Sequence, residues 1–316
     1  MTRKNSLFII FFLLLTLDVF AQNKAFKIIP LGVKGGIDES DLSAYMVAPA
    51  NSDNYVCLDA GTLRDGIEEA IANKIFAAAP EQVLRRNIKG YLISHSHFDH
   101  LAGLIINSPD DTAKNIYALP GCIETFKTHF FTWESWANFA DAGETPQLKK
   151  YHYVTLDPGS EVKLDHTAMT VKAFPLSHSN LTSTAFLVGN GDSYILYLGD
   201  TGPDEIEKSQ NLHRLWQSVA PLVQAKKLKA IMIEASFPDE QPDKTLFGHL
   251  TPRWLMKEMS ELEQVAGAGS LKGLNLVVTH VKPPESSIRR IRTQLADENK
   301  LGLNLIFPEQ GKELDL

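Results

Sequence analysis

Short apolar runs rich in β-branched and aromatic residues recur along the whole chain, and each run predicts a β-strand. Early runs follow one another closely, whereas later runs alternate with helical patterns. That order predicts an α/β fold in layers, with two mixed β-sheets packed face to face and helices outside. The runs are FKIIPLG (26–32), AYMVAP (44–49), YVCLDAG (55–61), GYLISH (90–95), NIYAL (115–119), MTVKAFPLSH (169–178), TAFLVGN (184–190), SYILYLGD (193–200), AIMIEAS (230–236), LNLVVTH (274–280) and LNLIF (303–307).

Apolar residues at helical spacing predict three helices among these strands. The second helix has a defined start, because threonine is a favourable N-cap residue and proline suits the first helical position. No internal repeat or low-complexity linker divides the sequence, so we expect residues 22–316 to form a single domain. The three segments are marked by Ile67, Ile71, Ile75 and Phe76 after Leu63, by Thr251–Pro252, and by Ile288, Ile291 and Leu295.

The first 21 residues have the pattern of a secretory signal peptide. Arg3 and Lys4 precede an apolar stretch at 7–20, and the sequence Val19-Phe20-Ala21 offers a cleavage site. The stretch is shorter than the roughly 20 residues that a membrane-spanning helix needs, and no later segment is apolar enough to span a bilayer. A retained membrane anchor is the alternative. We expect an exported protein, periplasmic or extracellular, with no membrane association after cleavage.

The charge of the chain bears on its partners. Without Arg3, Lys4 and Asp18 of the leader, the 31 basic and 38 acidic side chains become 29 and 37, a formal charge of −8. An acidic surface repels polyanions, so we do not expect an extended nucleic acid as a partner. A small anionic substrate is compatible with this charge if the site supplies local positive charge. The sequence gives no indication of oligomeric state.

Two features leave alternatives open. The segment 124–139 (ETFKTHFFTWESWANF) is dense in aromatic residues, and it predicts either a helical insertion that buries its own aromatic face or a lid whose rings stack on a substrate base. The two cysteines, Cys57 and Cys122, are too few for a disulfide scaffold. Cys57 lies in a strand-like run and is most simply a small core residue, although the sequence also permits a bridge.

The stretch HSHFDH (95–100) concentrates potential metal ligands where an apolar run ends. His95 and His97 are two positions apart in an extended segment, so they share a face and could converge on one ion. Asp99 and His100 follow as the chain turns and could face a second ion. Imidazole and carboxylate groups both ligate borderline divalent metals. Four such fixed positions would arise by chance on the order of once in a thousand chains, so the motif predicts a two-metal site.

Three further candidate ligands, His178, Asp200 and His280, each close a later apolar run. The carboxyl ends of neighbouring strands can meet at one edge of the sheets. Asp200 would be a natural bridge, because a carboxylate has two oxygens to share between two ions. Taken singly, each of these residues is also compatible with a capping or buried polar role.

These segments together resemble the metallo-β-lactamase superfamily and, within it, the class II cyclic-nucleotide phosphodiesterases. The resemblance covers about residues 44–284, and at WANF (136–139) Ala137 replaces the proline of a family W-P-N-F. It implies a four-layer αββα sandwich of two mixed β-sheets flanked by helices, with an aromatic-rich helical insertion near 121–150. The matching segments are LDAGTLRDG (58–66), SHSHFDHLAGLIINSPDD (94–111), LYLGDTGPD (196–204), IEASFPDE (233–240), LFGHLTP (246–252) and THVKPP (279–284).

The resemblance also implies roles for single residues. His249 would donate a proton to the leaving oxygen, Glu234 would orient its imidazole, and Asp99 would be catalytic with them; a surface histidine is the alternative for His249. Asp59 would be a buried carboxylate that fixes the metal loop. One metal would be held by His95, His97 and His178 and the other by Asp99, His100 and His280, with Asp200 shared. The remaining histidines match no motif and are expected to be ordinary structural or surface residues; they are His129, His152, His166 and His213.

The implied reaction is hydrolysis of the 3′ phosphoester bond of 3′,5′-cyclic nucleotides, cAMP or cGMP, to 5′-monophosphates. Two divalent ions would assist it, with Zn²⁺ expected first and Mn²⁺ or Fe²⁺ as alternatives. One rival is another hydrolase on the same fold, such as an RNase Z-like phosphodiesterase, a thioester hydrolase or a lactamase. The other rival is a protein that binds metal or cyclic nucleotide without turnover.

Overall fold

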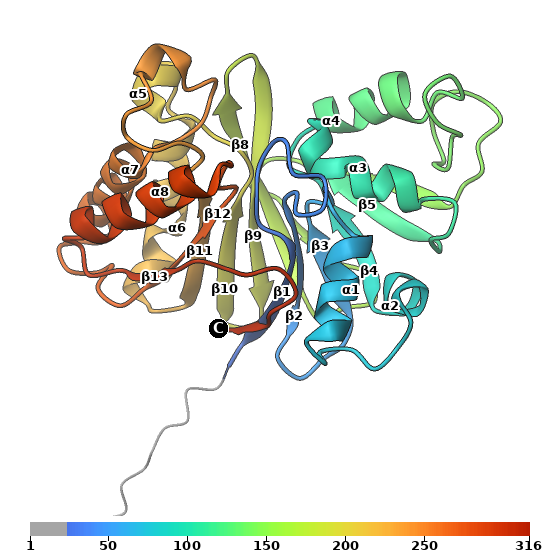
Figure 1. Ribbon diagram of the computed structural model, residues 1–316, viewed down its shortest axis with the longest axis horizontal. Helices are drawn as coiled ribbons and strands as arrows, with labels where there is room; N and C mark the ends of the chain where they lie inside the picture. The colour runs from blue at the N-terminus through green and yellow to red at the C-terminus, as the bar shows by residue number, and fades with distance from the viewer. Residues whose placement is uncertain (1–23) are drawn as a thin grey trace, which may run out of the picture.

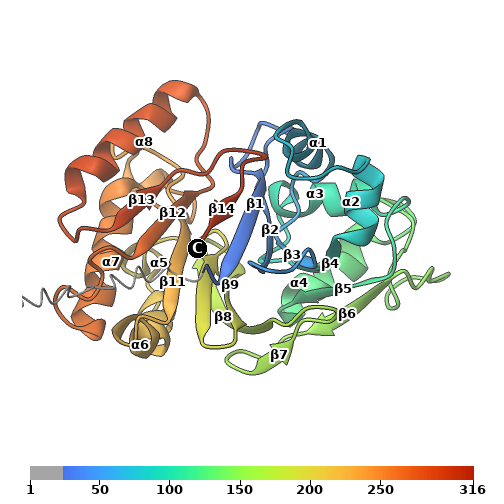
Figure 2. The same cartoon turned by 90° about the horizontal axis from the view of Figure 1, so that it is seen from below.

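The computed structural model describes residues 24–316 of the chain. The predicted signal peptide (1–21) lies outside these residues. Two seven-stranded sheets face each other in the middle of the molecule, with α1–α4 against one sheet and α6–α8 against the other (Figure 1). The layers are seen edge-on from below in Figure 2. This is the four-layer αββα sandwich expected from the sequence, and that prediction is confirmed.

The first sheet is built mainly from the N-terminal half of the chain. β2 runs antiparallel to both of its neighbours, β1 and β3, and β3 to β6 run parallel. Its strands, in spatial order, are β14 (Leu314–Asp315), β1 (Phe26–Gly32), β2 (Ala44–Pro49), β3 (Tyr55–Leu58), β4 (Ile88–Leu92), β5 (Lys114–Ala118) and β6 (Tyr151–Thr155).

The second sheet comes from the C-terminal half. β7 to β10 are antiparallel to their neighbours, and β10 to β13 run parallel. Consequently β8, β10, β11 and β12 all end at the same edge of this sheet. The strands, in spatial order, are β13 (Asn304–Ile306), β12 (Asn275–Thr279), β11 (Leu228–Glu234), β10 (Ser193–Leu198), β9 (Leu181–Asn190), β8 (Thr170–His178) and β7 (Glu161–Lys163).

Both faces of the central strands are buried, which explains why their sequences are continuous apolar runs rather than alternating ones. In β1, Ile28 packs between the two sheets, whereas its neighbour Ile29 packs under the helices of the first layer. In β12, Val277 faces the other sheet and Leu276 faces the helices of the fourth layer. The helices are α1 (Arg64–Ala72), α2 (Pro80–Arg86), α3 (Phe98–Asn107), α4 (Pro120–Thr125), α5 (Asp204–Glu207), α6 (Asn211–Gln224), α7 (Pro252–Ala266) and α8 (Glu285–Glu298).

The helical predictions agree with the structure in position and differ in detail. Ile67 lies in α1, but that helix ends at Ala72, so Ile75 packs on the core from the following turn. α7 begins at Pro252 with Thr251 as N-cap residue, yet the buried Thr251 hydroxyl makes no capping bond and has no hydrogen-bond partner within residues 24–316. α8 buries all three of its marker residues. None of the helices in residues 24–316 is both long and apolar enough to cross a membrane.

The aromatic segment is helical only in its first part, where α4 continues into a π-helical turn at Phe126–Phe130. Beyond it the indole N–H of Trp133 donates to Pro146 O (2.9 Å), and that of Trp136 donates to Ser108 Oγ (3.0 Å). Ser108 follows the last residue of α3, about 15 Å along the helix from its first turn. Trp136 is therefore tied to structure at the far end of α3 from HSHFDH, and Trp133 to the loop that contains Pro146.

Both cysteines are buried free thiols in this structure. Burial raises the pKa of each thiol well above its ordinary value, so they are inert core residues.

Candidate metal centre and active site

The HSHFDH stretch connects β4 to α3 at the edge where the two sheets meet. His95 lies in the extended segment after β4, and His97 is the N-cap residue of α3. Asp99 falls in the first turn of that helix, where the helix dipole favours a carboxylate. The apolar face of α3 is buried under the first sheet through residues such as Leu101 and Leu104, and this packing fixes the direction of the first turn.

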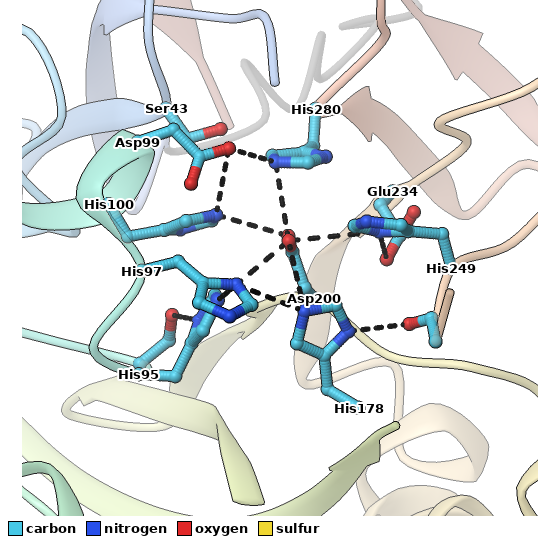
Figure 3. A network of polar contacts seen from close by, with 12 residues as sticks. Ser43, His95, His97, Asp99, His100, His178, Asp200, Glu234, His249 and His280 are labelled. Carbon is cyan, nitrogen blue, oxygen red and sulfur yellow. Dashed lines mark hydrogen bonds and ion pairs between the residues drawn. The ribbon is translucent and has the colours of Figure 1, made fainter. Parts of the chain in front are cut away.

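Strands of the second sheet bring the remaining ligand candidates to the same place. His178 is the last residue of β8, Asp200 lies two residues beyond β10, and His280 directly follows β12. His280 has a positive φ of 52°, which turns its side chain back toward the cluster. Figure 3 shows Asp200 in the centre, with side chains from both sheets arranged around it.

The seven side chains divide into two groups that share Asp200. In each group the ligand atoms lie within 4.8 Å of one another, a spacing at which one cation can contact them all. The shared carboxylate faces both groups: Oδ1 lies 3.3 Å from His100 Nε2, and Oδ2 lies 3.3 Å from His280 Nε2 and 3.8 Å from His178 Nε2. The groups are His95, His97, His178 and Asp200, and Asp99, His100, Asp200 and His280. The structure thus brings together all seven residues in the two sets expected from the sequence.

Four of the five histidines in these groups are held in the same way. In each, Nδ1 is hydrogen-bonded to the protein and Nε2 is directed into the cluster, an arrangement that fixes the tautomer and orientation of metal-ligating histidines. The Nδ1 partners are Ser94 Oγ for His95 (3.0 Å), Asp59 Oδ2 for His100 (2.7 Å), the Gly248 carbonyl for His178 (2.8 Å) and Ser236 Oγ for His280 (2.9 Å).

The electrostatics of the cluster fit divalent cations. Burial lowers the pKa of His178 to about 4 and that of His95 well below its usual value, so both imidazoles are neutral and can donate a lone pair. Burial would also lower the pKa of His100, but Asp200 and Asp59 raise it well above its ordinary value. The carboxylates therefore require positive charge at this point. The buried Nε2 of His100 has no hydrogen-bond partner within residues 24–316, and a cation would complete its environment.

Asp59 is fully buried directly behind the cluster. Besides His100 Nδ1, its carboxylate accepts hydrogen bonds from Ser94 N (2.7 Å), Ser94 Oγ (2.7 Å) and the Tyr197 hydroxyl (2.6 Å). With its acceptor capacity used in this way, Asp59 supports the loop from behind rather than facing an ion.

His249 and Glu234 form a buried pair beside the metal groups. His249 Nδ1 is 3.0 Å from Glu234 Oε1 and 3.7 Å from Asp200 Oδ2. Burial opposes protonation, but Glu234 and Asp200 raise the pKa of His249 above its ordinary value. His249 is only 5% exposed, so it is not a surface histidine. Of the four histidines without a motif, His129, His152 and His166 are exposed and His213 is half-buried, all outside the cluster.

Glu234, His249 and His280 form a third group with metal-ligand spacing. The Glu234 carboxylate, however, already accepts bonds from the backbone N–H groups of Thr201 (2.9 Å) and Leu250 (3.2 Å), in addition to the Ser236 hydroxyl. A carboxylate so fully bonded is a poor metal ligand. The structure therefore favours the His249–Glu234 pair as a hydrogen-bonded neighbour of the two metal groups rather than as a third metal group.

Sequence reasoning missed three features of the site. Ser236 bridges His280 to Glu234, and its position two residues after Glu234 was the available signal. Lys282 places its Nζ 2.9 Å from His249 Nε2. The Gly35–Gly36 pair packs on the cluster, and the Gly36 N–H donates to Asp99 Oδ2 (2.9 Å).

A family model described as "cAMP phosphodiesterases class-II" matches residues 21–311 of this chain. A 3′,5′-cyclic-nucleotide phosphodiesterase of Aliivibrio fischeri is 43% identical over 98% of this chain and 99% of its own length. This chain belongs to the class II cAMP phosphodiesterase family. Members of this family are enzymes, so the rival reading as a non-catalytic binding protein is not supported.

Solved structures agree on the fold. Unliganded yeast PDE1 superposes with a TM-score of 0.82 at 23% identity, covering 93% of this chain and 100% of that one. The metallo-β-lactamase fold protein YhfI of Bacillus subtilis superposes with a TM-score of 0.61 at 17% identity, covering 92% and 99% of the two chains. The class II phosphodiesterase sequence is thus carried on a metallo-β-lactamase fold.

Proposed function

We propose that this protein hydrolyses 3′,5′-cyclic nucleotides, cAMP or cGMP, to 5′-monophosphates with the help of two divalent cations, Zn²⁺ in the first instance. One observation carries the proposal: seven ligand groups in two sets lie beside the buried His249–Glu234 pair. Bound in these sets, the cations would neutralise phosphoryl oxygens and activate a water at neutral pH. We further propose that the protein acts outside the cytoplasm after removal of residues 1–21.

The side chains of the protein would contribute orientation and a proton. His249 would donate a proton to the departing ribose oxygen from Nε2, because Nδ1 is occupied by Glu234. Glu234 cannot move with the reaction, since the Thr201 and Leu250 N–H groups hold it. Asp99 is held by Gly36 N at the opposite side of the cluster and would orient the attacking oxygen.

Exposed apolar side chains next to the cluster support a nucleotide as substrate. Phe98 lies between His97 and Asp99 in sequence and is 66% exposed. Phe247 precedes Gly248, whose carbonyl holds His178, and is 65% exposed. Exposed aromatic faces near a phosphate site suit stacking on a purine base.

The decisive assay treats cAMP with the purified protein and separates the products by chromatography. We expect 5′-AMP with Zn²⁺, none after removal of metal by a chelator, and recovery when metal is restored. Bis(p-nitrophenyl) phosphate and a β-lactam run alongside test the rival hydrolases on this fold. Turnover of the β-lactam without release of 5′-AMP would refute the proposal.

Replacing His249 by Ala should leave metal content intact and lower kcat for cAMP by about 10²–10⁴-fold, the usual contribution of a general acid. The effect on bis(p-nitrophenyl) phosphate should be much smaller, because p-nitrophenolate departs without a proton. Metal content measured by mass spectrometry is the control. Loss of metal in this variant would show that His249 is a ligand instead.

A further inference from the structure

Lys282 places a cationic group inside the site that none of the roles above uses. It lies two residues beyond His280, and its Nζ is 2.9 Å from Nε2 of His249. Within residues 24–316 it forms no ion pair with a carboxylate, although several carboxylates surround the cluster. A half-buried ammonium without an anionic partner, beside two proposed metal ions, calls for an anion that arrives with the substrate.

The nitrogen that Lys282 contacts is the one needed for chemistry. Glu234 occupies Nδ1 of His249, so only Nε2 can serve the leaving oxygen. Without substrate, the Lys282 ammonium donates to that nitrogen. Nε2 can act only after Lys282 has found another acceptor close by. A phosphodiester bound at the metal groups brings non-bridging oxygens of that kind.

The side chain of Lys282 lies beside two residues, Phe237 and Gly36. Its Nζ lies 5.0 Å from the centre of the Phe237 ring, a cation–π distance. Gly36 also lies close by, since a Cβ added to it would lie 4.0 Å from both Cδ and Cε of Lys282. Gly36 also holds Asp99, so the lysine stem and the metal loop share one support. Because Phe237 and Gly36 hold its side chain near the cluster, the Lys282 ammonium can shift toward an anion and stay within the site.

We propose that Lys282 is a substrate-binding residue that donates a hydrogen bond to a non-bridging oxygen of the phosphodiester. This shift frees His249 Nε2 to take up a proton from water and pass it to the leaving oxygen. This inference rests on the proposed function and names the group that recognises the phosphate in addition to the cations. Lysine suits the task because its ammonium is a compact charge with three rotatable donors.

The test compares Lys282→Met, which keeps the stem and removes the charge, with Lys282→Arg, which keeps the charge. Lys227→Met is the control, because Lys227 pairs with Asp192 at the opposite end of β10 from Asp200. Substrates are cAMP and bis(p-nitrophenyl) phosphate, and inorganic phosphate binding to the zinc-loaded protein is measured by calorimetry. Metal content is determined for every variant.

We expect Lys282→Met to raise KM about 10- to 100-fold for both diesters and to weaken phosphate binding similarly, which is the loss expected for a hydrogen bond to a charged group. Lys282→Arg should recover most of the loss, and the control should match the parent. Unchanged KM and phosphate affinity in Lys282→Met, or loss of its metal, would overturn the proposal.

The leaving group separates this proposal from the general-acid role. Lys282→Met should impair both diesters, whereas His249→Ala should mainly impair cAMP. If the parent protein cleaves only the aryl diester, the cyclic-nucleotide function fails while the Lys282 comparison stands on that substrate. If it cleaves neither, phosphate affinity alone decides on Lys282.

Discussion

Gly35 shows how closely single residues are packed around the proposed metal ligands. A Cβ at this position would lie 2.1 Å from Cε1 and 2.4 Å from Nδ1 of the His280 ring. No real side chain tolerates such a contact, so the ring would have to move. Only glycine therefore fits at position 35 while the His280 ring keeps its place.

Gly35→Ala should accordingly displace His280 and weaken binding of the metal on its side by about 10–100-fold, as expected when the support of a ligand is disturbed. Gly121→Ala is a matched control, since a Cβ there meets nothing within 4 Å. Zinc titration with a competing chelator dye measures the affinities. Equal affinities in the two variants would mean that His280 does not ligate a metal.

Ser236 shows why the sequence predicts the proposed metal ligands but not the residues that hold them in place. Its hydroxyl lies 2.9 Å from His280 Nδ1 and donates to Glu234, so one serine links a proposed ligand to the proposed acid pair. The ligands could be predicted because four of them belong to the HSHFDH motif and the other three each end an apolar run. For Ser236 the only local signal is its position two residues after Glu234. The role of Lys282 has none, because it depends on a contact with His249, 33 positions earlier in the chain.

At the scale of elements, every apolar run named in the sequence became a strand, whereas β6, β7 and β14 were missed. The reason is physical. β6 is partly exposed and has no apolar run, since Val154 is its only aliphatic residue, and β7 and β14 are only three and two residues long. Strands buried on both faces can be recognised in the sequence as apolar runs. Short edge strands have no such run and form by pairing with a neighbouring strand.

The aromatic insertion is the element whose role the sequence left open. Trp136 is bonded to Ser108 at the end of α3 remote from the cluster, which favours the structural reading over the lid. Trp136→Phe should cost about 1 kcal/mol of stability, the typical worth of one hydrogen bond, and leave KM for cAMP unchanged. Thermal unfolding and steady-state kinetics measure the two effects.

Phe98→Ala provides the contrast for that experiment, because Phe98 is exposed directly beside the cluster. Its loss should raise KM for cAMP, in line with about 1–3 kcal/mol for the stacking of one base. A rise in KM for Trp136→Phe as large as that for Phe98→Ala would restore the lid interpretation.

For the whole molecule, the cluster is a junction between two halves. HSHFDH comes from the first sheet, while His178, Asp200 and His280 come from the second. Elsewhere the sheets are joined by apolar contacts such as those of Phe186, Tyr197 and Met232. Bound cations would therefore cross-link the halves at one edge of a largely apolar interface.

Removal of metal should then lower the melting temperature. A cation that binds only the folded state at 100 times its Kd contributes about 2.7 kcal/mol per site, and each kcal/mol shifts the melting temperature by roughly 2–4 °C in a domain somewhat smaller than this one. We expect a fall of about 5 °C or more upon chelation, reversed by Zn²⁺.

Because Asp200 belongs to both groups, Asp200→Asn should abolish most of the difference in melting temperature between the metal-loaded and metal-free forms, whereas the surface variant His152→Ala should keep it. Equal melting temperatures with and without metal in the parent protein would show that no bound cation links the two halves.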